Sequence, residues 1–253
     1  MLDGRARALF SSEPLMPVPA RSPWGWAMDA LRFIARPTPV FTRHAWSAAL
    51  VAALVTIFAL DLAVDWLAIL LIEEADSTLG FLPTPVEGEG SLAQEAFFAL
   101  LVAPLLEEAV YRGWMSGRVA ALRFALFGFA AEICFFASLW ARPQWEPILA
   151  GAGVVIALLG FILWLQTRER DVAVPAWFTR HFAALVWVSS VVFALIHLGN
   201  YEALTHPLGV LVVTPQLIGG LFLAYVRTRL GLRAAMAHHA AYNALAMALE
   251  EWG

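Results

Sequence analysis

The run Trp46–Ile72, WSAALVAALVTIFALDLAVDWLAILLI, is longer than the roughly 20 apolar residues with which an α-helix crosses a bilayer. It therefore predicts a membrane-spanning helix. The composition agrees, because 61% of the 253 residues are hydrophobic and 14% are charged, whereas soluble domains have about 25% charged residues. We expect an integral membrane protein whose helices are in contact with the lipid bilayer. The net charge of -4 gives no sign of nucleic-acid binding.

Further apolar runs follow, and together they predict about seven transmembrane helices. The fold class is therefore expected to be all-α, a polytopic membrane helix bundle. No internal repeat is visible, which argues against a transporter with carboxylates at the midplane. The predicted runs after the first are Ala93–Arg112, Phe124–Trp140, Pro147–Leu165, Ala183–His197, Gly209–Val226 and Leu232–Leu249.

A shorter amphipathic helix is predicted ahead of the bundle, over Trp24–Arg36. Ser22-Pro23 is a suitable N-cap and first-turn pair, and Pro37 ends the helix. We interpret this segment as a helix lying in the membrane interface; a disordered tail with chance periodicity is the alternative. The residues that share its apolar face are Trp24, Ala27, Leu31 and Ile34.

The placement of arginine predicts the orientation, because cytoplasmic flanks of membrane helices carry an excess of basic residues. Several arginines lie within residues 1–44, whereas the segment 73–95 is acidic and lacks arginine. We expect a cytoplasmic N-terminus, an external loop at 73–95 and a location in a bacterial inner (plasma) membrane. The chain then divides into a cytoplasmic tail with the interfacial helix, residues 1–44, and a transmembrane domain, residues 45–253.

Three charged residues lie within six positions at the end of the run 93–112, namely Glu107, Glu108 and Arg112. Each costs at least ~2.5 kcal/mol in hydrocarbon, so these side chains need partners. Glu108 and Arg112 are one helical turn apart and can pair. Glu107 points about 100° away from Glu108 and can serve chemistry. A purely structural charge network at a helix end is the alternative.

Polar residues also occupy the later runs. His197 closes one run, and His239 and Asn243 share a face of the last run, next to a second pair, His238 and Tyr242. Two polar pairs on an apolar helix indicate a protein-lined cavity rather than lipid. For each group alone, structural hydrogen bonding explains the pattern about as well as catalysis does.

Taken together, these residues compose a plausible water-activating site. Glu107 can act as general base towards water, and a histidine can hold that water or protonate a leaving amine. Another histidine with Asn243 can donate hydrogen bonds to an oxyanion. No serine or cysteine has a visible base nearby, so direct attack by water is favoured. A divalent metal site is the alternative, but there is no His-Glu-x-x-His motif and zinc rarely takes asparagine, so we expect no cofactor.

Three motifs, in order along the chain, resemble the signature of the CAAX-protease and bacteriocin-processing (CPBP/Abi) family. The likeness covers roughly residues 45–250. It implies an intramembrane glutamic endopeptidase of helical fold that works without metal. Its substrate would be a prenylated tail, a leader peptide or a membrane-protein segment. The motifs are Glu107-Glu108-x-x-x-Arg112, Phe193-x-x-x-His197 and His239-x-x-x-Asn243.

The resemblance also implies a role for each motif residue. Glu107 would be the catalytic base, and His197 would share in activating water. His239 with Asn243 would form the oxyanion site. The supporting residues would be Glu108 and Arg112. Two helices between the first and second motifs are more than the family pattern leads us to expect.

One alternative function and one geometric problem stay open. The alternative is a non-proteolytic membrane scaffold or assembly subunit that retains the family fold and binds a membrane complex partner. The geometric problem is depth, because the helix rise places His197 roughly 10 Å further out than Glu107.

Three further acidic residues lie within apolar runs but outside the motifs. Asp61 and Asp65 lie one turn apart in the first long run. We interpret them as the outer end of a helix that stops near residue 64, in preference to a cavity lining. Glu132, in the run 124–140, is expected to pair with an arginine.

Overall fold

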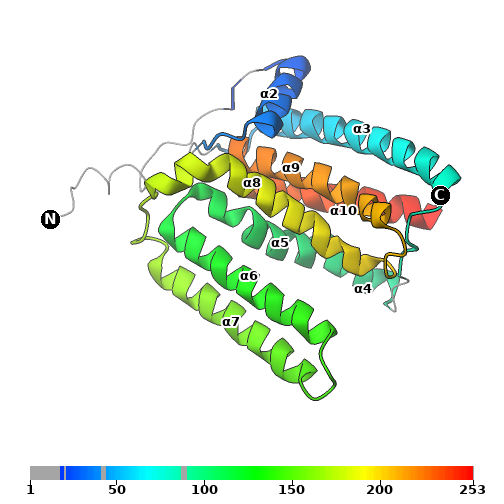
Figure 1. Cartoon of the computed structure of the whole chain (residues 1–253). Coiled ribbons are helices and arrows are strands. Elements are labelled where there is room, and N and C mark those ends of the chain that lie inside the picture. The colour runs from blue at the N-terminus through cyan, green and yellow to red at the C-terminus, as the bar shows by residue number, and fades with distance from the viewer. Residues whose placement is uncertain (1–17, 20, 41–43, 87–89, 253) are drawn as a thin grey trace. The chain divides into compact units, whose positions relative to one another are not determined.

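Apolar helices make up most of the structure, a computed structural model that describes residues 18–19, 21–40, 44–86 and 90–252 (Figure 1). Within those residues the one β-type pairing is an isolated bridge between Pro85 and Tyr201. Five of the described helical segments are long and apolar enough to cross a membrane. The expected all-α, polytopic membrane bundle is therefore confirmed, although the count of seven spans is not.

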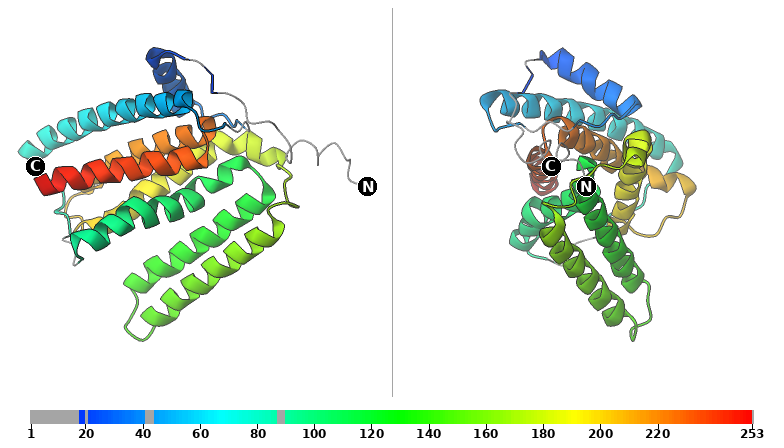
Figure 2. Two further views of the ribbon diagram at one scale, coloured as in Figure 1. Left: turned by 180° about the vertical axis from the view of Figure 1, so that it is seen from behind. Right: turned by 90° about the vertical axis from the view of Figure 1, so that its left-hand side faces the viewer.

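The chain forms two compact units. The first is Glu107–Arg180, and the second joins residues 18–106 to residues 181–252. In the second unit, α9 (Thr214–Arg229) packs against both α3 (Ala48–Leu79) and α10 (Leu232–Trp252), as Figure 2 shows. Residues 220–226 of α9 are all buried, so this helix forms the core of the unit.

Helix α3 is longer than predicted. It continues past residue 64, and through part of the expected loop 73–95, to Leu79, where Gly80 ends it in the left-handed conformation (φ 62°). Asp61 and Asp65 are fully buried in its middle. The prediction that these carboxylates mark the outer end of a helix is therefore wrong, because no glycine or proline stops the helix before Gly80.

The predicted run Ala93–Arg112 is helical, but its register changes within it. It consists of α4 (Leu92–Phe97), the π-helical turn η1 (Phe98–Val102) and α5 (Ala103–Tyr111). The amide of Ala103 donates to the carbonyl of Phe98, which is the π-type spacing. Pro104 has no N–H to donate to the preceding turn, and such a residue favours a local change of register.

The first unit is dominated by the hairpin of α6 (Val119–Leu139) and α7 (Glu146–Thr167). A Cβ atom on Gly153 would lie 3.1 Å from the carbonyl of Ala131, so the two helices approach closely at this glycine. Close approach at small residues is typical of helix pairs in membranes. Both helices lie within a few residues of their predicted bounds.

The helical segments between α7 and α9 include residues of the second motif. Helix α8 runs over Ala176–Ile196, so it starts earlier than predicted. The short 3₁₀ turn η3 (His197–Asn200) follows it. A second 3₁₀ segment, η4 (Pro207–Val213), leads into α9, and together they extend slightly beyond both ends of the predicted run Gly209–Val226.

The predicted interfacial helix is α2, Pro23–Ala35, and Ser22 caps it through a hydrogen bond from the Gly25 amide at 3.1 Å. Its protein-facing side differs from the predicted apolar face, because Trp24 and Leu31 are exposed. This exposed apolar face is the one that an interfacial helix presents to lipid. The residues that α2 buries instead are Trp26, Ala30 and Phe33.

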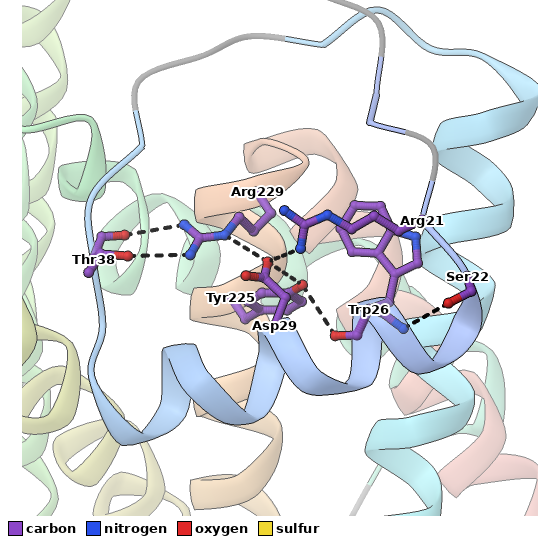
Figure 3. Close-up of polar contacts among 8 residues, drawn as sticks. Arg21, Ser22, Trp26, Asp29, Thr38, Tyr225 and Arg229 are labelled. Carbon is purple, nitrogen blue, oxygen red and sulfur yellow. Dashed lines mark hydrogen bonds and ion pairs between the residues drawn. The ribbon is translucent and has the colours of Figure 1, made fainter.

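One carboxylate anchors α2 to the end of α9 (Figure 3). Oδ2 of Asp29 accepts hydrogen bonds from the Tyr225 hydroxyl at 2.9 Å and from Nε of Arg229 at 3.1 Å. The guanidinium of Arg21 lies 2.8 Å from the same oxygen. Arg229 also donates to the carbonyl and hydroxyl oxygens of Thr38, both at 3.3 Å. Arg229 of α9 is thereby tied both to α2, through Asp29, and to the chain after α2, through Thr38, while Arg21 of the chain before α2 also pairs with Asp29.

Candidate active site

The side chain of Phe193, on α8, brings the second and third motifs together. Its ring centroid lies 4.7 Å from that of His197 and 6.0 Å from that of His239, edge to face in both cases. Nδ1 of His197 is 2.7 Å from the Phe193 carbonyl oxygen. A carbonyl only accepts, so Nδ1 is the donor and Nε2 carries the lone pair of the neutral ring.

Asn243, of the third motif, lies against the π-helical turn. Its Nδ2 donates to the carbonyl of Ala99 at 2.7 Å. In a π-helical register the donor to this carbonyl would be the amide of residue 104, which is proline. Asn243 thus supplies the hydrogen bond that the backbone cannot, and it ties α10 to the helical segment that continues into the first motif.

The Glu108–Arg112 pair of the first motif is present as predicted. Oε1 of Glu108 lies 2.8 Å from NH1 of Arg112, and the two side chains are 0% and 1% exposed. Both groups are therefore removed from solvent as a neutral pair. A pair of this kind is costly to break one partner at a time.

Glu107 is half-buried and shares a face of α5 with Tyr111, one turn later. The Tyr111 hydroxyl donates to Oε2 of Glu132, on α6, at 2.7 Å. The prediction that Glu132 pairs with an arginine is therefore wrong. Its hydrogen-bond donor is a tyrosine, because the side of α6 that carries Glu132 packs against α5.

Two further polar contacts join α3 to α10 and were not predicted. Nε2 of His238 lies 2.7 Å from Oδ2 of Asp61, and both side chains are buried. One turn along each helix, Asp65 and Tyr242 lie close enough to interact electrostatically. The signal for these contacts was present, since each helix carries two polar residues at a spacing of one turn.

An apolar cavity lies between α3 and α10, beside the second of these contacts. Its volume is about 270 Å³, and Trp66, Leu245 and the ring of Tyr242 are among its walls. Glu73 lies at its edge as a polar group. The cavity has room for part of an alkyl or isoprenoid chain.

The donor atoms needed for a metal ion do not converge in the part of the chain that the structure describes. No group of three or more His, Cys, Asp or Glu side chains is arranged there to hold a metal.

One known family model matches the part of the chain that carries the second and third motifs. The family model described as type II CAAX prenyl endopeptidase Rce1-like matches residues 169–245. Over these residues the chain is similar to the Rce1-like family. The family resemblance inferred from the motifs is thereby confirmed. No curated protein and no solved structure matches the chain significantly.

The Rce1-like segment contains all of α8, η3, η4 and α9, and most of α10. His197, His239 and Asn243 all fall inside it, whereas Glu107 precedes it. The five apolar helices indicate an integral membrane protein, and the match shows that this segment is similar to a family of membrane proteases. The roles of the four candidate residues stay predictions.

Proposed function

We propose that the protein is an intramembrane endopeptidase that hydrolyses a peptide bond by direct attack of water. One observation carries this proposal. The ring of Phe193 holds His197 and His239 on one aromatic side chain, within the Rce1-like segment. Two histidines from separate helices that share a contact in an apolar bundle are suited to proton transfer at a bound substrate.

The roles assigned to the residues follow their motif positions and their hydrogen bonds. Glu107 takes a proton from water as it attacks the carbonyl carbon. Nε2 of His197 is the basic nitrogen of that ring and assists in orienting the water. His239 and Asn243 donate hydrogen bonds to the oxyanion. An amide group has two N–H donors, so the contact of Asn243 with Ala99 leaves the other N–H for the substrate.

The protonated base then delivers its proton to the leaving amine as the tetrahedral intermediate collapses. The products are a new carboxylate and a new amine, so the water is fully accounted for. The substrate class that the family description favours is a prenylated CAAX tail. A leader peptide or a membrane-protein segment fits the same chemistry. The apolar cavity between α3 and α10 supports a substrate that carries a lipid-like chain.

The proposed location is a bacterial inner membrane with the N-terminus in the cytoplasm. The anchoring of α2 agrees with this assignment, because Arg32 and Arg36 lie on or next to a helix whose apolar side chains Trp24 and Leu31 are exposed. Basic residues beside an interfacial helix favour the anionic cytoplasmic leaflet.

The test uses the full-length protein, purified and reconstituted in lipid nanodiscs. Three probes are offered separately: a farnesylated peptide ending in a CAAX sequence, an unmodified leader peptide and a transmembrane peptide. Cleavage is followed by mass spectrometry. Glu107→Gln and His239→Ala should each lower kcat at least ~100-fold, the size of a lost general acid–base contribution. Glu146→Gln, at an exposed position of α7, is the matched control.

Cleavage of one probe by the wild type, lost in Glu107→Gln and kept in Glu146→Gln, supports the proposal. Equal rates for the wild type and Glu107→Gln, or no cleavage of any probe, would overturn it.

A scaffold or assembly subunit is the second candidate function. It is favoured by the burial of the Glu108–Arg112 pair along α5 and of the Asp61–His238 pair, which joins α3 to α10 without a substrate. This candidate predicts a membrane complex that co-purifies with the wild type and equally with Glu107→Gln. Loss of the complex in Glu107→Gln would count against it.

A further inference from the structure

The first motif has an acidic neighbour that belongs to none of the three motifs. Glu132 lies in α6, one of the helices apolar and long enough to cross a membrane. Oε2 of Glu132 accepts the hydrogen bond from the Tyr111 hydroxyl at 2.7 Å. Ionisable side chains inside membrane helices are costly and are usually retained for a function.

Helical geometry connects this hydrogen bond to Glu107. Glu107 and Tyr111 form one stripe along α5, and Glu108 and Arg112 form the adjoining stripe. In the second stripe, Glu108 and Arg112 pair with each other. In the first stripe, the Tyr111 hydroxyl donates a hydrogen bond to Glu132 on α6. Glu107 lies one turn before Tyr111 on the face of α5 from which the Tyr111 hydroxyl reaches Glu132, so the three side chains belong to the same polar side of this helix contact.

The contact between α5 and α6 is close at this point. A Cβ atom on Gly128 would lie 2.7 Å from the Val110 side chain, so the two helices touch where only glycine fits. The ring of Phe129 packs edge-on against Tyr111, with centroids 5.2 Å apart. Gly128 and Glu132 are one turn apart and share a face of α6. The same contact therefore determines where the carboxylate of Glu132 lies.

We propose that Glu132 is a positioning residue for Glu107 and acts through the Tyr111 hydroxyl. The hydrogen bond fixes the turn of α5 that carries Glu107, and so fixes the direction from which this carboxylate approaches water. This inference rests on the proposed endopeptidase function. It adds a member to the site from α6, a helix outside both the three motifs and the Rce1-like segment.

The test compares variants that remove the hydrogen bond with one that keeps it. Tyr111→Phe removes the donor, and Glu132→Leu removes the acceptor without adding a polar group. Glu132→Gln retains an acceptor oxygen of similar reach. Removing either partner should lower kcat about tenfold or more and leave KM unchanged, because a misplaced base affects the chemical step. Glu132→Gln should restore most of the loss.

A double variant tests whether the two residues act as one unit. Tyr111→Phe with Glu132→Leu should be no slower than either single variant, since both remove the same hydrogen bond. Thermal midpoints in the same nanodiscs report folding, and Glu146→Gln is again the control. Glu132→Leu leaves the buried Tyr111 hydroxyl without its acceptor and should lower the midpoint, whereas the double variant removes both polar groups and should recover most of that loss.

The results distinguish a failure of the positioning role of Glu132 from a failure of the proposed endopeptidase function. If Glu107→Gln is inactive but Tyr111→Phe and Glu132→Leu cleave at the wild-type rate, the inference is overturned and the endopeptidase function stands. A fall in kcat that matches a loss of thermal stability, without recovery in Glu132→Gln, also overturns it. If Glu107→Gln cleaves as fast as the wild type, the proposed function fails and the inference fails with it.

Discussion

Asp61 and His238 meet between α3 and α10, with the carboxylate Oδ2 2.7 Å from the imidazole Nε2 and no more than 1% of either side chain exposed. The ring of Phe58 covers the imidazole edge-on, with centroids 5.2 Å apart. The pair is thus removed from solvent and joins two helices that are distant in sequence.

Removing one partner of this pair should destabilise the fold strongly. Asp61→Ala leaves His238 buried without its acceptor, and breaking a buried pair in this way costs roughly 3–5 kcal/mol. Asp61→Asn keeps an acceptor oxygen and should cost less. Thermal midpoints in one detergent check the order, with Ser77→Ala, an exposed position of α3, as control. Equal midpoints for Asp61→Ala and Ser77→Ala would contradict the structural role.

Contacts along one helix could be predicted from the sequence, whereas contacts between helices could not. The Glu108–Arg112 pair follows from the 3.6-residue period alone. The Asp61–His238 and Tyr111–Glu132 contacts depend on which helix faces which. Hydropathy indicates that a polar residue in an apolar run needs a partner, but it does not identify the partner.

The contact between Asn243 and Ala99 should matter because residue 104 is proline. Asn243→Ala removes the donor to a carbonyl that Pro104 cannot serve, so it should lower the thermal midpoint. Pro104→Ala supplies a backbone N–H, and in that background Asn243→Ala should cost less. A double-mutant cycle of thermal midpoints measures this coupling. Strict additivity of the two changes would show that the proline does not create the need for Asn243.

The stability of the α2 anchor should depend on pH through Asp29. Burial alone would raise the pKa of Asp29, but the Tyr225 hydroxyl and the charges of Arg229 and Arg21 outweigh it and hold the pKa below its ordinary value of 3.8. A lowered pKa in the folded state means that the stabilisation is complete above the ordinary value. It is lost as the pH falls through the lowered value.

Asp29→Asn is the variant that measures this dependence. At pH above about 5 it should have a lower thermal midpoint than the wild type, and the difference should shrink as the solution is acidified below pH ~4. A midpoint difference that is constant across this range would show that the charge of Asp29 does not anchor α2.

Replacement by alanine should destabilise the protein at Gly117 and stabilise it at Gly151. Gly117 has φ +69°, and a Cβ atom there would lie 2.6 Å from the ring of Phe178, so Gly117→Ala is strained in its backbone and in its packing. The left-handed conformation alone costs roughly 1–2 kcal/mol. Gly151, within α7, has no atom within 4 Å of such a Cβ, and Gly151→Ala should stabilise by about 0.5–1 kcal/mol. Thermal midpoints of the two variants check the signs.

The ends and breaks of the helices show a second limit of sequence reasoning. The apolar signal fades near Ile72, yet α3 continues to Leu79, because a polar surface does not end a helix and Gly80 does. Pro104 marks an irregularity inside the run 93–112, but the π-type spacing before it depends on a partner, Asn243, from another helix. Local composition therefore located the helices better than it located their boundaries.

The two glutamates of the first motif should respond differently to the loss of their carboxylates. Glu108→Ala leaves the guanidinium of Arg112 buried without its partner, which costs roughly 3–5 kcal/mol. Replacing both residues together, Glu108→Leu with Arg112→Met, removes the unpaired charge and should recover most of that stability. Glu107→Gln lies on the other stripe of α5 and should leave the thermal midpoint near that of the wild type while it abolishes cleavage. Thermal midpoints and cleavage rates measured on the same preparations separate the two glutamates. Recovery of activity in the double variant would show that Glu108 and Arg112 serve the fold, and persistent loss of activity in a stable double variant would assign them to the chemistry instead.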